Sequence, residues 1–293
     1  MSSGVRLEVP SNLDYFATLV AQDEGFPLLE AAIAVGQDRD AGLDPQAVMV
    51  ELDRLGARLA RRIPADAVPL QRLRWLNRFF FDELAFGGNV NDYYAADNSY
   101  LHCVLDSRRG IPITLALLYI EMASHAGLKA RGISFPGHFL VKLRLPRGEV
   151  VIDPFTGHSL SRENLEERLG PYRRQRGLLG DFEVPLGLFL QEAAPRELLA
   201  RLLRNLKEIH LSAEDWPALL QVQERLVRLM PLSWTEHRDR GLAYAELGLD
   251  DLALADLHRY LDNCGDAEDA PALRERMGRM GRMGRPDTGR RAP

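Results

Sequence analysis

The sequence predicts an α+β protein in which a small antiparallel sheet lies between two helical regions. Residues 12–85 carry apolar side chains at helical spacing. Residues 128–155 change to short runs of β-branched and aromatic residues between turn signals, which is typical of adjacent strands. Helical spacing returns over residues 196–264, together with signs of an internal repeat. We therefore expect four regions: 1–98, N-terminal helices; 99–185, the α+β core; 186–267, helical repeats; and 268–293, a disordered basic tail.

Composition excludes several classes of protein. The 293 residues are 46% hydrophobic, which supplies a sizeable core, and the net charge of −5 gives no reason to expect nucleic acid or an anionic membrane as a partner. Cys103 and Cys264 are too few and too far apart for a disulfide framework. Without a signal-like N-terminus or a long apolar run, we expect a soluble cytoplasmic protein, with nucleic acid contacted at most weakly through the Arg-rich tail.

The N-terminal region shows helix signals in order. Asp44 and Pro45 are an N-cap and a first helical residue, and they open a helix with one apolar face. The run 70–86 predicts another helix, ended by Gly87 and Gly88. The polar, aromatic stretch 89–100 follows without periodicity. Its candidate partner-binding residues are Tyr93, Tyr94 and Asn98, although residues of these types also commonly cap and cover neighbouring helices.

The core begins with a short helix that we expect to end at Gly110. A nearly all-apolar helix follows, opened by Pro112 and closed by Gly127, and a helix apolar on most faces is buried. Three strands are then predicted: 128–135, 138–145 and 150–155. Ser161 caps a further helix, which we expect to give way to a Gly-, Pro- and Arg-rich linker reaching about residue 185.

The C-terminal helices carry a repeat signature. The signature residues are Gly241, Tyr244, Gly248, Ala253 and Leu257. These positions suit a 34-residue helix-turn-helix repeat, and a poorer copy 34 residues earlier ends at Pro231. The segment looks like a short tetratricopeptide array, which implies an extended peptide or another protein as partner, with Tyr244 as a candidate contact. Because fewer than three repeats seldom bury a stable core, we expect the array to dock on the core.

His138 and Asp153 are the candidate chemical pair. His138 opens one predicted strand and Asp153 ends the next, 15 residues later. Antiparallel pairing of these strands would bring the carboxylate to the imidazole, where it would orient the ring. The pair acts on a substrate only if a nucleophile lies within hydrogen-bond reach. A buried pair that merely holds the sheet in register is the alternative, and from chemistry alone we favour it.

Three motifs carry a family resemblance. The residues Arg109-Gly110-Ile111-Pro112, His138-Phe139 and Asp153-Pro154 resemble, in order, the motifs of the transglutaminase-like branch of the cysteine-protease fold. Over residues 12–265 the pattern is similar to the bacterial SirB-type transglutaminase-like and tetratricopeptide family, associated with regulation of invasion genes. The resemblance implies that Pro112 occupies the nucleophile position and that the function is regulatory or scaffolding.

Proline at position 112 removes cysteine-type acyl transfer, because its side chain has no nucleophilic atom. A relocated nucleophile at Cys103, or an activated water, is the alternative, which would make the protein a hydrolase or acyl transferase of amide bonds. A metal site would draw on His102, Cys103, His138, Asp153 and His158, whose spacing is not that of a zinc site, so we expect neither metal nor cofactor. Our leading hypothesis is a catalytically degenerate, partner-binding protein.

Overall fold

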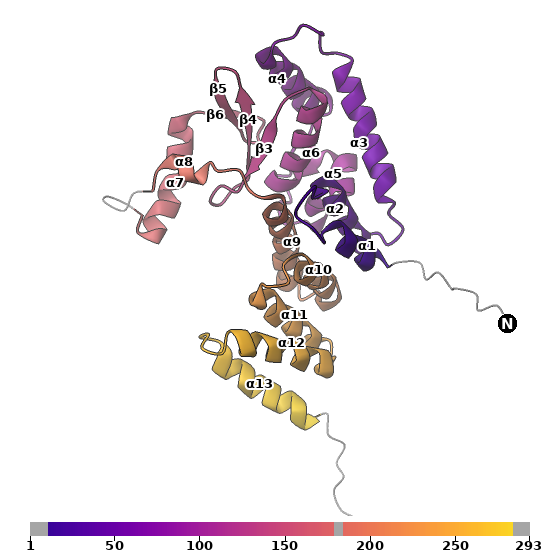
Figure 1. Ribbon diagram of the computed structural model, residues 1–293, viewed down its shortest axis with the longest axis vertical. Coiled ribbons are helices and arrows are strands. Elements are labelled where there is room, and N and C mark those ends of the chain that lie inside the picture. Colours follow the sequence, from indigo (N-terminus) through magenta and orange to yellow (C-terminus); the bar gives the residue numbers. More distant parts are fainter. Residues whose placement is uncertain (1–10, 179–183, 284–293) are drawn as a thin grey trace, which may run out of the picture. The chain divides into compact units, whose positions relative to one another are not determined.

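The computed structural model describes residues 11–178 and 184–283 (Figure 1). The chain divides into two compact units, residues 1–205 and 206–293. Each unit is described by itself below. The first holds the sheet and the predicted His-Asp pair, and the second holds the repeat helices.

Helices form the start of the first unit. They are α1 (Asn12–Leu19), α2 (Leu28–Ala34), the 3₁₀ turn η1 (Val35–Asp38), α3 (Pro45–Ala60), α4 (Pro69–Asn77) and the π-helical turn η2 (Arg78–Glu83). Asp44 caps α3 as predicted, by accepting a hydrogen bond from the Gln46 N–H. The single helix predicted over 70–86 is instead divided at Asn77. The wider π turn directs Phe79 and Phe80 into the core, and Phe80 stacks on Phe86.

The next segment leads to the central helix. It comprises β1 (Gly87–Gly88), η3 (Ala96–Ser99), α5 (Leu101–Ser107), β2 (Arg109–Gly110) and α6 (Pro112–His125). Helix α5 ends at Arg108, which adopts a left-handed conformation with φ 62°, rather than at Gly110 as predicted. The helix stops early because Arg109 and Gly110 pair in parallel with β1. Helix α6 is buried along most of its length, as its apolar sequence predicts.

The sheet has four antiparallel strands in the order β3-β4-β5-β6. They are β3 (Ala130–Ile133), β4 (Leu140–Leu145), β5 (Gly148–Ile152) and β6 (Ser159–Leu160). The first three overlap the predicted strands, but β4 begins at Leu140 and β5 ends at Ile152, so His138 and Asp153, predicted within strands, lie just outside them. The two-residue strand β6 is too short to carry a pattern. In Figure 1 the sheet lies between α6 and the following helices, α7 (Arg162–Arg176) and α8 (Leu186–Phe189).

Helix α7 extends further than the sequence predicts. It continues through Gly170 and Pro171, where a linker is expected, and ends at Gly177 in a left-handed conformation. Leu165 and Leu169 are buried against the sheet, while Pro171 lies on the exposed side. The packed apolar face therefore outweighs the loss of one backbone donor.

The second unit is helical. Helix α9 (Pro195–Ser212) leads into it, followed by α10 (Trp216–Leu229), α11 (Trp234–Glu246), α12 (Asp250–Asn263) and α13 (Ala270–Met283). A Cβ at Gly241 would lie 3.0 Å from Leu257 Cγ and 3.2 Å from the Ala253 carbonyl. Gly248 has a φ of 72° between the two helices. The repeat signature thus marks a close helix crossing and a left-handed turn.

Helix α13 corrects the prediction of a disordered region over 268–293. Leu273 and Met277 are buried against Leu257 and Tyr260 of α12, and Met280 packs on the same cluster. These three side chains follow one helical face. The Gly-Arg-Met repetition conceals that face in the sequence, because the same triplet is typical of low complexity. Residues 284–293 of the predicted tail lie outside the described residues.

Candidate functional site

His138 and Asp153 come together at one end of the sheet. His138 lies in the turn before β4, and Asp153 directly follows β5. The register pairs Val141 with Ile152, which places the preceding turn and the end of β5 side by side. The His138 Nε2 atom lies 2.8 Å from the Asp153 Oδ1 atom. The two residues are therefore a hydrogen-bonded pair.

Asp153 is held by more partners than the sequence indicates. Its side chain is 1% exposed, and Oδ1 also accepts a hydrogen bond of 3.0 Å from the Phe155 N–H. Oδ2 lies 3.0 Å from Arg168 Nη1 of α7. Burial raises the pKa of Asp153, but the hydrogen bond and charge of His138, the Phe155 N–H and Arg168 together lower it to about 2. The carboxylate is thus ionised at neutral pH.

Arg201 of α9 holds the backbone around His138. Its Nη2 donates a hydrogen bond of 2.8 Å to the His138 carbonyl, and its Nη1 donates one of 2.6 Å to the Ser134 hydroxyl. The guanidinium also lies over the Phe139 ring, and burial lowers the pKa of Arg201. Sequence reasoning missed Arg201 because α9 is distant in sequence, and it missed Arg168 because no motif marks which side of α7 faces the pair.

Pro112 is buried at the first position of α6. Thr114 follows two residues later in the sequence. Its hydroxyl accepts a hydrogen bond from the Ile111 N–H at 3.2 Å and donates one to the Asn98 carbonyl at 2.8 Å. Thr114 therefore caps its own helix and fixes the preceding loop. Both hydrogen-bonding roles of this hydroxyl are structural.

A glycine contact connects the start of α6 to the pair. Strand β2, which immediately precedes α6, pairs with β1. Within β1, a Cβ at Gly88 would lie 2.3 Å from atoms of the Phe155 ring, and the Gly88 N–H donates to the Phe155 carbonyl at 2.9 Å. Phe155 is two residues beyond Asp153, and its ring centroid is 6.4 Å from that of His138. The site thus includes strand β1, the ring of Phe155 and the pair.

Cys103 lies in a different environment. Its sulfur is 3.2 Å from His102 Nε2 on α5, and the nearby charges include those of Asp97 and Arg39. Burial raises the pKa of the Cys103 thiol to about 11. The structure therefore joins His138 to Asp153 and leaves Cys103 as a neutral thiol beside His102.

The aromatic loop borders the site through one of its tyrosines. Tyr93 and Tyr94 are 42% and 78% exposed, and the Tyr93 ring centroid lies 5.9 Å from that of Phe155. Asn98, predicted as a contact residue, is instead 3% exposed. Its amide donates to the Asp92 and Tyr93 carbonyls, so it shapes the loop from beneath.

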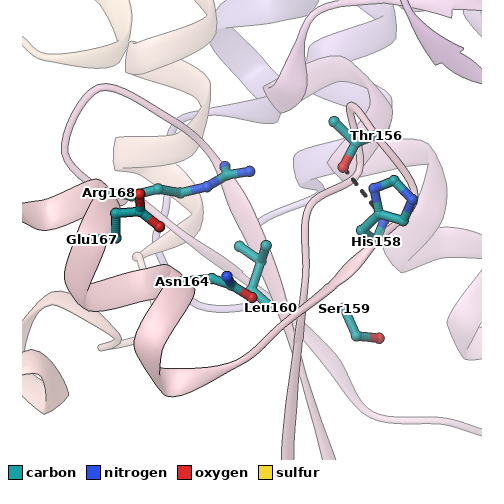
Figure 2. A pocket seen from close by; sticks show the side chains of 7 residues that line it. All are labelled: Thr156, His158, Ser159, Leu160, Asn164, Glu167 and Arg168. Atoms are coloured by element: carbon teal, nitrogen blue, oxygen red, sulfur yellow. Dashed lines mark hydrogen bonds between the residues drawn. The ribbon is translucent and has the colours of Figure 1, made fainter.

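A polar pocket of about 520 Å³ is lined in part by Arg168 (Figure 2). Its lining residues are Thr156, His158, Ser159, Leu160, Asn164, Glu167 and Arg168. Because Arg168 also contacts Asp153, this pocket and the pair share one cation. No sequence signal pointed to the pocket, since β6 was not predicted.

The second unit has a groove of its own, of about 450 Å³. It is lined by Val227, Arg228, Pro231, Trp234, His237, Arg240 and Arg259. Tyr244, predicted as a contact residue, is instead 8% exposed, and its hydroxyl donates a hydrogen bond to the Glu224 carboxylate. The Tyr244 side chain therefore packs between helices. The exposed charged side chains of the groove are those of Arg228 and Arg259, and Trp234 lies beside them.

Comparisons with known proteins agree with this architecture. The model of the transglutaminase-like superfamily matches residues 46–204, and a tetratricopeptide-repeat model matches residues 206–278. Within the described residues, no helix has both the length and the apolar character that crossing a bilayer requires. No solved structure matches the chain significantly.

Bacterial relatives match over most of their length. A UPF0162 protein of Xylella fastidiosa is 36% identical over 82% of this chain and 84% of its own. The UPF0162 protein YchA of Escherichia coli is 29% identical, and protein SirB1 of Salmonella typhimurium is 27% identical, each over 81% of this chain and 87% of its own. The relatives and the order of the two matched models, transglutaminase-like and then tetratricopeptide, lead to one conclusion. The chain belongs to the bacterial UPF0162 family of transglutaminase-like proteins with tetratricopeptide repeats.

Proposed function

We propose that this protein is a non-catalytic regulatory or scaffolding module of the bacterial cytoplasm, which binds an extended segment of another protein. The proposal rests chiefly on Pro112. A buried proline occupies the first position of the helix where the related enzymes carry their nucleophile, while His138 and Asp153 remain paired. A base and an orienting carboxylate without a nucleophile cannot form an acyl intermediate.

The neighbouring nucleophilic groups support the same conclusion. The Thr114 hydroxyl is engaged by Ile111 and Asn98. With a pKa of about 11, Cys103 exists as thiolate in only about one molecule in 10⁴ at pH 7. Neither side chain supplies an activated nucleophile.

The groove of the second unit supports partner binding. Arg228 and Arg259 have side chains 41% and 54% exposed, and Trp234 adds an aromatic surface between α10 and α12. Arg240 is held by the buried carboxylate of Asp256. Exposed cations beside an aromatic ring suit an acidic segment that also carries an apolar residue.

Photo-crosslinking in bacterial cells tests the proposal on the full chain. A photoreactive residue at Leu232, which is 79% exposed beside the groove, is expected to capture a discrete partner. Arg259→Glu is expected to abolish the product, since it reverses a groove charge. Arg54→Glu on α3 is the matched control, because both arginines are exposed and follow an acidic residue at i−3. Crosslinking that is equal in both variants, or no stronger than from Val50 on α3, would count against the proposal.

The rival function is amide hydrolysis with water as nucleophile. The observation in its favour is the intact 2.8 Å contact between His138 and Asp153, which keeps a base oriented. It requires His138 to control turnover.

A further inference from the structure

Three potential metal ligands that the proposed function does not use lie close together in the first unit. Asp53 lies on α3, and Glu121 and His125 lie one turn apart on α6. One ligand atom from each lies within 4.8 Å of the other two. His125 Nε2 is 3.2 Å from Glu121 Oε1 and 3.6 Å from Asp53 Oδ1.

The two separations from His125 suit ligands around one small cation, and the third, between Asp53 and Glu121, is bounded at 4.8 Å. With zinc bonds of about 2.0–2.1 Å, neighbouring ligand atoms of a tetrahedron are about 3.3 Å apart. The two measured distances from His125 bracket that value. Asp53 is 66% exposed, so its carboxylate has room to adjust.

The orientation of the imidazole is a second, independent observation. The His125 side chain is 25% exposed, but its Nε2 atom is shielded from solvent and makes no hydrogen bond, although a Glu121 oxygen lies within ion-pair distance at 3.2 Å. That oxygen is therefore off the axis along which the ring nitrogen donates or accepts. A hydrogen-bonded pair places the oxygen on this axis, whereas in a metal site the cation occupies the axis and the oxygens lie beside it.

Gly56 allows this orientation. It lies three residues after Asp53 on α3, and a Cβ there would be 2.3 Å from Cγ and Cδ2 of the His125 ring. The ring thus packs directly on the backbone of α3. Any larger residue would displace the imidazole from the two carboxylates.

We propose that Asp53, Glu121 and His125 bind a divalent transition-metal ion, with zinc the best match to one imidazole and two carboxylates and with water completing the coordination. The ion joins α3 to α6, the helix that begins at Pro112. The proposal is independent of partner binding and of the His138-Asp153 pair. Sequence spacing did not indicate the site, because Asp53 lies far from Glu121 in the chain.

Metal titration of the full-length, untagged, chelator-stripped protein tests the site. Co²⁺ is titrated with visible absorption as the readout, and Zn²⁺ is used to displace it. The native protein is expected to take up one equivalent. Asp53→Asn, Glu121→Gln and His125→Asn are each expected to weaken binding by at least about tenfold, the size of effect that even outer-shell partners produce.

Asp66→Asn is the matched control, because it removes an exposed carboxylate of the same unit that lies outside the cluster. It is expected to bind as the native protein does, and Zn²⁺ is expected to raise the Tm of these two proteins but of none of the ligand variants. Asp53 is exposed, so its variant remains informative even if a change in α6 disturbs folding. Native protein that takes up no equivalent, or Asp53→Asn binding as tightly as Asp66→Asn, overturns the proposal.

Discussion

At the scale of single residues, Asp153 is the most constrained side chain of the site. It accepts hydrogen bonds from His138 and from the Phe155 N–H, and it pairs with Arg168. Breaking such a buried arrangement leaves its partners without compensation, which costs more than the arrangement contributes relative to an apolar replacement. Removing one member of the pair would therefore destabilise the fold, even if no chemistry depends on the pair.

Asp153 predicts a pH-dependent contribution to stability. Its folded pKa of about 2 lies below the ordinary aspartate value of 3.8, so the contribution is present above pH 4 and is lost as the pH falls toward 2. With about 1.4 kcal/mol per pKa unit, the contribution is about 2–3 kcal/mol. Asp153→Asn is expected to destabilise the first unit at pH 7, and by less at pH 3.

Tryptophan emission during urea unfolding measures this difference. The chain has three tryptophans, and Trp75 alone belongs to the first unit. In a Trp216→Phe, Trp234→Phe background it reports on that unit. A destabilisation that is the same at pH 7 and pH 3 would show that the ionised carboxylate of Asp153 is not the cause.

The Pro112→Cys substitution tests whether the His138-Asp153 pair faces position 112. In a Cys103→Ser, Cys264→Ser background, the new thiol at the start of α6 is expected to have a pKa of about 4–7, as thiols near histidine at helix N-termini do. The rate of iodoacetamide labelling against pH gives that value. Adding His138→Ala is expected to move the profile toward an ordinary thiol, and an unchanged profile would separate His138 from position 112.

At the scale of elements, the pairing of α11 with α12 depends on the absence of a side chain at Gly241. The Cβ position is 3.0 Å from Leu257 Cγ and 3.2 Å from a backbone oxygen of Ala253. Backbone cannot retreat as a flexible side chain can. The repeat signature is thus a steric requirement of this crossing.

Gly241→Ala is expected to destabilise the second unit by about 1–3 kcal/mol, the usual cost of overpacking. Trp216 and Trp234 report on urea unfolding of that unit in a Trp75→Phe background. Gln221→Ala is the control, since Gln221 is exposed on α10 of the same unit and is replaced by the same residue. Equal stability of the two variants would mean that α11 and α12 do not require the glycine.

At the scale of the whole molecule, the two units carry different chemistry. Residues 46–204 match a superfamily of enzymes, and residues 206–278 match a repeat that generally mediates binding between proteins. In the first unit His138 and Asp153 form a hydrogen-bonded pair, and the second unit presents arginines and Trp234 in a groove. The proposed function assigns recognition of a partner, and no turnover, to this combination.

Ammonia release from casein and from glutamine amides tests that conclusion on the full chain. If the proposed function holds, native protein and His138→Ala give the same background rate, because the Pro112 side chain has no nucleophilic atom. His138→Ala is informative because the side chain is partly exposed, at 21%. A native rate that falls on this substitution would establish the rival hydrolase function.

The sequence by itself determined the order of the domains, the sheet strands β3 to β5, the cap at Asp44 and the pairing of His138 with Asp153. These depend on local signals, namely periodicity, turn residues and motif order, which are complete within short segments. Only the tertiary structure decided the remainder. Arg201 and the three proposed metal ligands, Asp53, Glu121 and His125, connect elements distant in sequence. The contact of Arg168 with Asp153, the burial of Asn98 and Tyr244 and the helical packing of α13 depend on how elements pack, which no local pattern contains.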